Sequence, residues 1–201
     1  DLLSIVGPSG SGKSTLLGLL GLLDLPTSGV VTVQGRDATS LGDAERSRLR
    51  GEAIGFVFQQ FHLIPHLTAL ANVETALLYR GLSAGERSRR AFEALERLGL
   101  GDRHDHRPVQ LSGGEQQRVA IARAIVTEPL VVLADEPTGA LDTANAANIM
   151  EVFGGLQSPE RAVCIVTHDR DVASSTQRRI SMLDGEVVAD EEQATSRVIS
   201  P

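Results

Sequence analysis

The sequence predicts an α/β fold in which a helical subdomain is inserted into a core built on a mostly parallel sheet. Short apolar runs alternate with helical patterns along most of the 201 residues, and strands separated by helices usually form a parallel sheet covered on both faces. The stretch from about Thr68 to Arg107 interrupts this alternation with helical patterns alone. We therefore expect one domain (1–201) that consists of a core (1–66 and 108–190), a helical subdomain (67–107) and a tail (191–201).

Four elements are expected before residue 60. Runs rich in leucine and β-branched residues favour strands, and glycine, proline and asparagine-like turn residues limit them. The expected elements are a strand from Leu2 to Val6 stopped by Gly7-Pro8, a helix from Lys13 to Gly21 that ends before Pro26, a strand from Val30 to Val33 closed by Gln34-Gly35, and a strand from Ile54 to Phe58.

Three helices are expected next, and each follows a residue that can cap it. Thr68 is a candidate cap, while Ser83-Ala84-Gly85-Glu86 and Ser112-Gly113-Gly114-Glu115 have the spacing of capping boxes. In such a box, serine and glutamate side chains each bond a free backbone N–H. The helices are expected from Thr68 to about Tyr79, from Ser83 to Leu98 with Gly99 as the stop signal, and from Ser112 to about Thr127.

Further buried strands are expected toward the C-terminus. They run from Leu130 to Ala134, from Ala162 to Val166, and from Ile180 to Leu183, with a turn at Asp184-Gly185 into Val187-Val188. Cys164 is the single cysteine and lies within one of these apolar runs. It cannot form an intrachain disulfide, so we interpret it as a small core residue rather than a nucleophile.

Composition and hydropathy argue against two classes of protein, nucleic-acid-binding proteins and proteins that themselves span a membrane. The net charge of -7 gives no basic surface for the phosphates of nucleic acid, so no nucleic-acid partner is expected. The longest apolar stretch, Leu16 to Leu23, is interrupted by glycines and is far shorter than the roughly 20 residues that cross a bilayer. Any membrane-spanning partner is therefore expected to be another chain.

A glycine-rich loop carries the strongest chemical signal. Residues 7–15 match the phosphate-binding loop and follow a predicted strand and precede a predicted helix, as that motif requires. Glycines let backbone amides approach phosphate oxygens, and the helix adds its positive end. The only lysine of the chain, Lys13, lies here, whereas the other 18 of 19 basic residues are arginine. The expected nucleotide-binding residues of this loop are Gly7, Pro8, Ser9, Gly10, Ser11, Gly12, Lys13, Ser14 and Thr15.

Two acidic residues follow the strand expected at Leu130 to Ala134. Asp135 would lie at the C-terminal edge of the sheet, where ligands of open α/β sheets bind, and its carboxylate can hold Mg²⁺ through water. Glu136, one residue farther, can polarise an attacking water as a general base. An apolar run before Asp-Glu alone usually marks only a strand end, but the phosphate-binding loop favours the functional interpretation.

The segment Leu111-Ser112-Gly113-Gly114-Glu115 is a candidate second anion site. It places a hydroxyl and two glycine amides at the positive end of a helix. The first loop already wraps one nucleotide, so this second site would bind the γ-phosphate of a nucleotide held by another subunit. A well-capped helix without any ligand is the alternative that local physics leaves open.

These motifs together resemble the ABC ATPase family. The resemblance covers nearly the whole chain and implies the P-loop NTPase (RecA-like) fold, with antiparallel strands and an adenine-stacking aromatic residue N-terminal to Leu2, so we expect the chain to be truncated there. The motifs that carry it are the phosphate-binding loop, Gln59, Leu111-Ser112-Gly113-Gly114-Glu115, Asp135-Glu136, Ala140-Leu141-Asp142 and Thr167-His168-Asp169.

The resemblance implies a role for each motif residue. Catalysis would use Glu136, His168, Gln59 and Lys13, with His168 holding the γ-phosphate and the attacking water. Mg²⁺ would be held by Ser14, Gln59 and Asp135, and Gln59 would sense the membrane subunit; Gln60 is the alternative for that role. Nucleotide binding across a dimer would use Ser112, Gly113, Gly114, Glu115 and Asp142.

The expected function is therefore that of an ATP-binding and ATP-hydrolysing subunit of an ABC transporter. It would dimerise head to tail around ATP and Mg²⁺ on the cytoplasmic face of the plasma membrane, and energise export or release through separate permease subunits. Segments 54–65 and 133–139 look most like the lipoprotein-releasing and macrolide-exporting types. A soluble ABC ATPase of DNA repair or ribosome regulation is the alternative.

The remaining histidines are expected to play no catalytic part. His104 and His106 resemble a metal pair but have no third ligand at suitable spacing. His62 and His66 flank Pro65 in the segment that, in the family, faces the membrane subunit. They are expected to pack or be solvated there.

Overall fold

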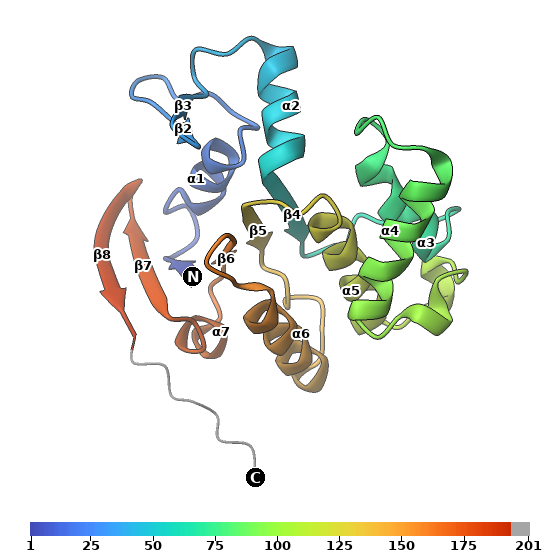
Figure 1. The fold of residues 1–201 in the computed structure, drawn as a ribbon. Coiled ribbons are helices and arrows are strands. Elements are labelled where there is room, and N and C mark those ends of the chain that lie inside the picture. Colours follow the sequence, from blue (N-terminus) through green and yellow to red (C-terminus); the bar gives the residue numbers. More distant parts are fainter. Residues whose placement is uncertain (194–201) are drawn as a thin grey trace.

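A computed structural model describes residues 1–193 of the chain (Figure 1). Residues 194–201, most of the tail expected at 191–201, lie outside this described part. Strand β8 continues to Glu192, two residues into that tail.

The core is a six-stranded sheet in the order β4-β5-β6-β1-β7-β8. All neighbouring strands are parallel except β7 and β8, which form an antiparallel hairpin. The predicted α/β class with a mostly parallel sheet is therefore confirmed. The strands are β1 (Leu2–Val6), β4 (Ile54–Phe58), β5 (Val131–Asp135), β6 (Ala162–Val166), β7 (Arg178–Leu183) and β8 (Glu186–Glu192).

Helices cover both faces of this sheet (Figure 1). Alternate residues of β5 show why: Val132 belongs to the apolar cluster shared with α5, α6 and α7, whereas Leu133 belongs to the cluster shared with α1 and α2. The helices are α1 (Lys13–Leu20), α2 (Asp43–Ala53), α5 (Gly113–Ile125), α6 (Thr143–Leu156) and α7 (Arg170–Ser174). Cys164 is buried in the second cluster, where burial raises the pKa of its thiol to about 12, as a core residue requires.

The segment expected as a helical subdomain holds α3 (Ala69–Glu74), a 3-10 helix (Thr75–Leu77), α4 (Ala84–Arg97) and a second 3-10 turn (Gly101–Arg103). Figure 1 shows α3 and α4 beside α5 and away from the sheet. They form a third apolar cluster, which includes Val119 and Ala122 of α5, whereas Ile121 of the same helix packs in the sheet cluster. Helix α5 therefore joins the two groups of elements.

Two expectations about local structure are wrong in part. The strand expected at Val30 to Val33 is only Thr32–Val33 (β2), which pairs with Arg36–Asp37 (β3) across the expected Gln34-Gly35 turn. At the start of α4, Ser83 accepts a hydrogen bond from the Glu86 amide, but the Glu86 carboxylate pairs with Arg89 and Arg90. Only half of that capping box forms, because two guanidinium groups on the next turn compete for the glutamate.

Candidate functional site

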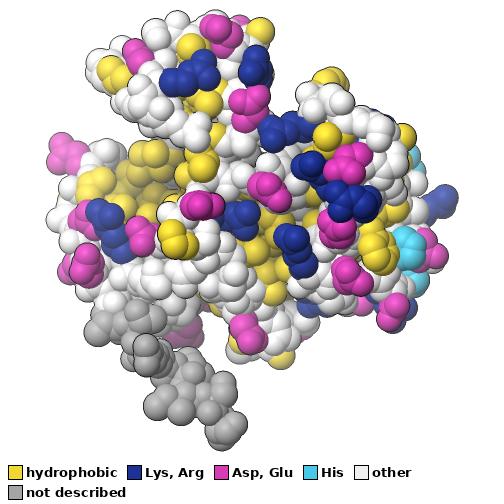
Figure 2. All heavy atoms as spheres, in the orientation of Figure 1, with side chains coloured by type: hydrophobic (Ala, Val, Ile, Leu, Met, Phe, Trp, Pro, Cys, Tyr) yellow, Lys and Arg dark blue, Asp and Glu magenta, His cyan; other side chains and the backbone are white. Residues whose placement is uncertain are grey.

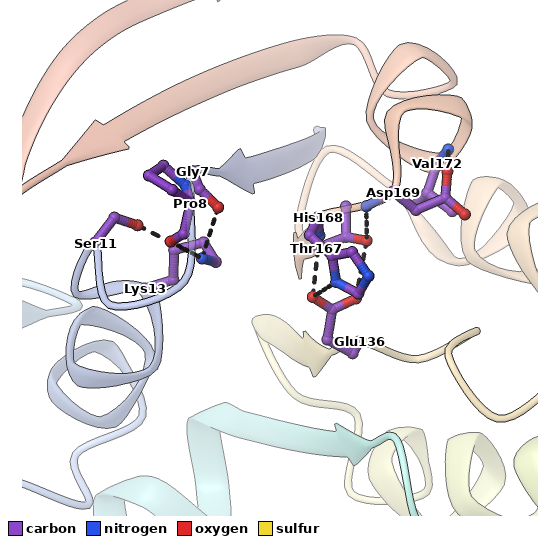
Figure 3. Close-up of polar contacts among 9 residues, drawn as sticks. All are labelled: Gly7, Pro8, Ser11, Lys13, Glu136, Thr167, His168, Asp169 and Val172. Carbon is purple, nitrogen blue, oxygen red and sulfur yellow. Dashed lines mark hydrogen bonds and ion pairs between the residues drawn. The ribbon is translucent and has the colours of Figure 1, made fainter.

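The phosphate-binding loop joins β1 to α1, in the setting that the sequence predicts (Figure 3). Gly10 and Gly12 have φ angles of 82° and 92°, a region that other residues seldom adopt. A side chain at Gly7 would overlap the Met182 carbonyl and the Ser11 hydroxyl. The loop therefore needs its glycines for backbone shape and for close packing against β7.

Lys13 is folded over this loop. Its Nζ donates to the carbonyl oxygens of Gly7 at 2.8 Å and Pro8 at 2.9 Å (Figure 3). An ammonium group has three donors and no acceptor, so carbonyl oxygens hold it in place without neutralising its charge. The loop thus presents one fixed positive charge beside the free amides at the start of α1.

A cavity of about 440 Å³ lies at the carboxyl edge of the sheet, in the size range of small-molecule sites. It brings together loop residues and the ends of β5 and β6, which are neighbouring strands. The lining residues are Ser9, Gly10, Gly12, Lys13, Ser14, Thr15, Asp135, Glu136, Val166 and His168. Residues that lie up to 159 positions apart in the chain, Ser9 and His168, therefore face one space.

Asp135 ends β5 and is half-buried in this cavity. Burial is the largest cause that raises the pKa of its carboxyl, the neighbouring Glu136 raises it further, and Lys13 opposes both. The exposed hydroxyl of Ser14 lies in the same cavity. The Asp135 carboxylate and the Ser14 hydroxyl are oxygen ligands of the kind that Mg²⁺ prefers. The raised pKa of Asp135 shows that Lys13 alone does not compensate its negative charge.

Glu136 is held by the segment that follows β6 (Figure 3). Its Oε1 accepts from the His168 backbone N–H at 3.0 Å and lies 2.6 Å from His168 Nδ1, and its Oε2 accepts from Thr167 Oγ1 at 3.1 Å. The pairing of Asp135 with Val166 across β5 and β6 places these residues side by side. Glu136 itself has φ 45°, a strained conformation of the kind that clusters at functional sites.

Thr167 is a site residue for which the sequence analysis assigned no role. Its hydroxyl is fully buried, donates to Glu136 and accepts from the Asp169 N–H at 3.0 Å. The sequence did contain a signal for Thr167, because it is a polar residue directly after the apolar strand β6.

Gln59 and Gln60 lie outside the lining of the cavity, and both are exposed. Gln59 directly follows β4 and lies against Gly139, where an added Cβ would be 2.8 Å from the Gln59 Nε2. Gly139 is three residues beyond Glu136. The structure therefore brings Gln59 next to the loop of the expected general base.

The segment Ser112-Gly113-Gly114-Glu115 opens α5 with a complete capping box. Ser112 N–H donates to Glu115 Oε2 at 2.8 Å, and Glu115 N–H donates to Ser112 Oγ at 3.3 Å. The segment does not line the cavity of the phosphate-binding loop. One chain therefore keeps the two candidate anion sites apart.

Asp142 lies beside that segment and caps α6. It accepts from the Asn145 backbone and side-chain N–H groups at 2.9 and 2.7 Å, and these hydrogen bonds lower the pKa of its carboxyl. A side chain at Gly114 would press on Asn145, and one at Gly113 would meet Leu141. The glycines thus let the start of α5 lie close to the start of α6.

Three of the other histidines, His62, His104 and His106, have local partners. His104 Nδ1 contacts the Gly101 carbonyl at 2.7 Å, His106 pairs with Asp105, and the His62 ring packs on Phe58. Within residues 1–193 no group of three or more His, Cys, Asp or Glu residues is arranged to hold a metal. The helices in that range are also all too short or too polar for a membrane span.

Comparison with known proteins gives consistent matches. The family model described as ABC transporter matches residues 1–139. An ABC transporter ATP-binding protein of Bacillus subtilis (strain 168), YvrO, is 50% identical over 95% of this chain and 83% of its own length. The macrolide export ATP-binding/permease protein MacB of Burkholderia lata is 52% identical over 94% of this chain, which spans only 28% of that longer protein.

Solved structures agree with these sequence matches. The dimeric, post-hydrolysis structure of the ATP-binding cassette MJ0796 with ADP and Pi superposes with a TM-score of 0.85 at 48% identity. The alignment covers 96% of this chain and 86% of the other.

Proposed function

The chain belongs to the ABC transporter family and is an ATP-binding subunit of the ATPase type, and from this premise we propose that it forms half of a two-chain ATPase that drives a membrane permease. The observation that carries the proposal is the separation of its two candidate anion sites. The cavity holds Lys13, Asp135, Glu136 and His168, but Ser112 lies outside it. A second copy would supply the missing part.

In this proposal the loop from Gly7 to Thr15 wraps the phosphates of ATP, with Lys13 on the β- and γ-phosphates. Ser14, Asp135 and Gln59 would hold Mg²⁺. When bound, that ion would neutralise charge on the β- and γ-phosphate oxygens. The raised pKa of Asp135 supports this assignment, because a cation in the cavity would relieve the cost of its buried charge.

For hydrolysis, Glu136 accepts a proton from the attacking water as the general base. His168 holds the γ-phosphate and the water, while Thr167 and the His168 backbone orient the Glu136 carboxylate. Gln59, on the loop after β4, lies against Gly139 near this base and would contact the attacking water from outside the lining of the cavity. The contacts around Glu136 support this division, since each carboxylate oxygen has a partner from the segment after β6.

The second copy would place Ser112, Gly113, Gly114 and Glu115 against the γ-phosphate, with Asp142 at the dimer interface. Two nucleotides would then hold two chains head to tail. Repulsion between ADP and phosphate after hydrolysis would let the pair open. The exposed position of Ser112 at the start of a long helix supports a ligand from outside the chain.

We further propose that the transporter which this chain drives is of the lipoprotein-releasing or macrolide-exporting type, so that ATP hydrolysis would power export or release of a substrate. We propose that the chain acts on the cytoplasmic face of the plasma membrane, where the helical subdomain (67–107) and the Gln59 loop contact a permease. The similar proteins named above are transport proteins, so DNA repair or ribosome regulation is not favoured. On the face drawn in Figure 2, acidic and basic side chains are interspersed.

The variant Glu136→Gln tests the proposal. It keeps the shape of the side chain but removes the base, so turnover should fall by about 10²–10⁴-fold while ATP binding persists and dimers accumulate. Turnover, nucleotide binding and mass by light scattering are measured with and without ATP. The control is Glu151→Gln, an exposed residue of α6. Parental turnover in Glu136→Gln would refute the assignment of Glu136 as the base, and a monomeric protein with full activity would refute the two-chain site.

A further inference from the structure

Helix α5 contacts the loops on both sides of the candidate site. Near its start, Gln117 is fully buried, and its Nε2 donates to the Pro137 carbonyl at 2.6 Å. Pro137 directly follows Glu136. The other amide atom, Gln117 Oε1, has no partner within the described residues. This buried contact therefore fixes the position of α5 relative to the expected general base.

Farther along the same helix, Arg123 contacts the loop after Gln59. Its two terminal nitrogens donate to the carbonyl oxygens of His62 at 2.6 Å and Phe61 at 2.8 Å. These two loop residues have φ angles of 48° and 56°. Bulky residues seldom adopt positive φ, so a loop with two of them in succession needs support from outside.

The guanidinium of Arg123 makes its hydrogen bonds to this loop. Its side chain is largely buried, and burial lowers the pKa of its guanidinium. No salt bridge of Arg123 is found among residues 1–193, so no carboxylate there competes for the group. The planar fork of a guanidinium suits two neighbouring carbonyls, whereas the ammonium of a lysine is a single point charge.

We propose that Arg123 is a positioning residue that fixes the loop carrying Gln59 relative to Glu136, with α5 as the rigid connection. The helix follows its cap Ser112, contacts Pro137 through Gln117 and holds the Gln59 loop through Arg123. Binding of a partner's nucleotide at Ser112 would thus shift the position of α5, and with it the loop after Glu136 and the loop that carries Gln59. This inference rests on the proposed function for its consequence in turnover, but not for the contact itself.

Hydrogen exchange of the whole protein tests the contact directly. Arg123→Met removes the charge and the donors, and Arg123→Lys keeps the charge but loses the fork. The control is Arg97→Met on the exposed side of α4. We expect exchange of a peptide covering residues 59–66 to rise about 10-fold in Arg123→Met, less in Arg123→Lys and not in Arg97→Met, while residues 113–121 keep parental protection. Parental exchange at 59–66 in both Arg123 variants would overturn the proposal, as would equal loss of protection throughout α5.

ATP turnover tests the consequence. Arg123→Met should lower kcat about 10-fold with KM for ATP changed less than about 2-fold, because the loop acts on hydrolysis and not on binding. Its effect should not add to that of Gln59→Ala, since both act through one loop. Additive losses, or a rise in KM alone, would contradict positioning through Gln59. If the parental protein lacks ATPase activity the proposed function fails, and the exchange experiment still decides whether Arg123 holds the loop.

Discussion

Ser112 has two roles that two substitutions can separate. It caps α5 through the Glu115 amide, and it is the exposed hydroxyl proposed to contact a partner's γ-phosphate. Ser112→Ala removes both functions. Ser112→Asp keeps a good cap, because aspartate caps helices as well as serine does, but it places a negative charge against the phosphate.

The expected magnitudes differ accordingly. Loss of a serine cap costs about 1 kcal/mol, which corresponds to a Tm lower by about 2–4 °C in a protein of this size. Loss of one donor to charge that develops in the transition state costs about 10²–10³-fold in kcat. Ser112→Asp should therefore keep the parental Tm within about 1 °C and lose turnover at least as completely as Ser112→Ala.

The assays are calorimetry without nucleotide, ATP turnover, and light scattering with ATP in the Glu136→Gln background. Dimers should form with Ser112 intact and fail to form in Ser112→Asp. Full turnover in Ser112→Asp would refute the second anion site and leave Ser112 as a helix cap only.

Three further predictions concern single positions. Gly139→Ala places a Cβ 2.8 Å from the Gln59 Nε2, so turnover should fall about 10-fold with unchanged Tm; equal loss in Gln59→Ala and no further loss in the double variant would be the check. Asp135→Asn should raise Tm and abolish Mg²⁺-dependent turnover. Because the pKa of Asp135 is raised in the folded protein, its negative charge destabilises the fold fully at neutral pH and not at all well below the ordinary pKa. The Tm difference between Asp135→Asn and the parent should therefore shrink in acid. Cys164, with a pKa raised to about 12, should resist iodoacetamide at pH 8 until the protein is unfolded, and labelling of the native protein would contradict its burial.

Local signals predicted the elements that depend on local physics. The strands Ile54–Phe58 and Ala162–Val166 have the expected bounds, and Thr68, Ser83 and Ser112 cap helices as expected. Apolar runs and capping residues act over one or two turns of chain, so sequence alone reveals them.

Helices α2 and α6 were not predicted, for different reasons. Only Leu49 and Ala53 of α2 and Ile149 and Phe153 of α6 are buried. The two buried residues of α2 make no periodic stripe that sequence inspection can recognise. In α6, by contrast, Ile149, Val152, Phe153 and Leu156 have helical spacing and pack in one apolar cluster, so the sequence held a signal for this helix that was missed. The order of strands in the sheet also depends on long-range packing, which no local pattern encodes.

The candidate site was predicted in its members but not in its contacts. The motifs identified Lys13, Asp135, Glu136 and His168, and the structure places all four around one cavity. The bonds of Glu136 to Thr167 and His168 depend on β5 lying next to β6. Likewise, Arg123 looks like any other helical arginine until the fold brings Phe61 and His62 to it.

The use of arginine at almost every basic position has a practical consequence for Lys13. It is the single side-chain amine among 201 residues, and it lies at the mouth of the phosphate-binding loop. An amine-directed reagent or a lysine acetyltransferase would therefore find one side-chain target on this chain. Chemical labelling of that target, followed by intact mass, would report occupancy of the nucleotide site without any engineered probe.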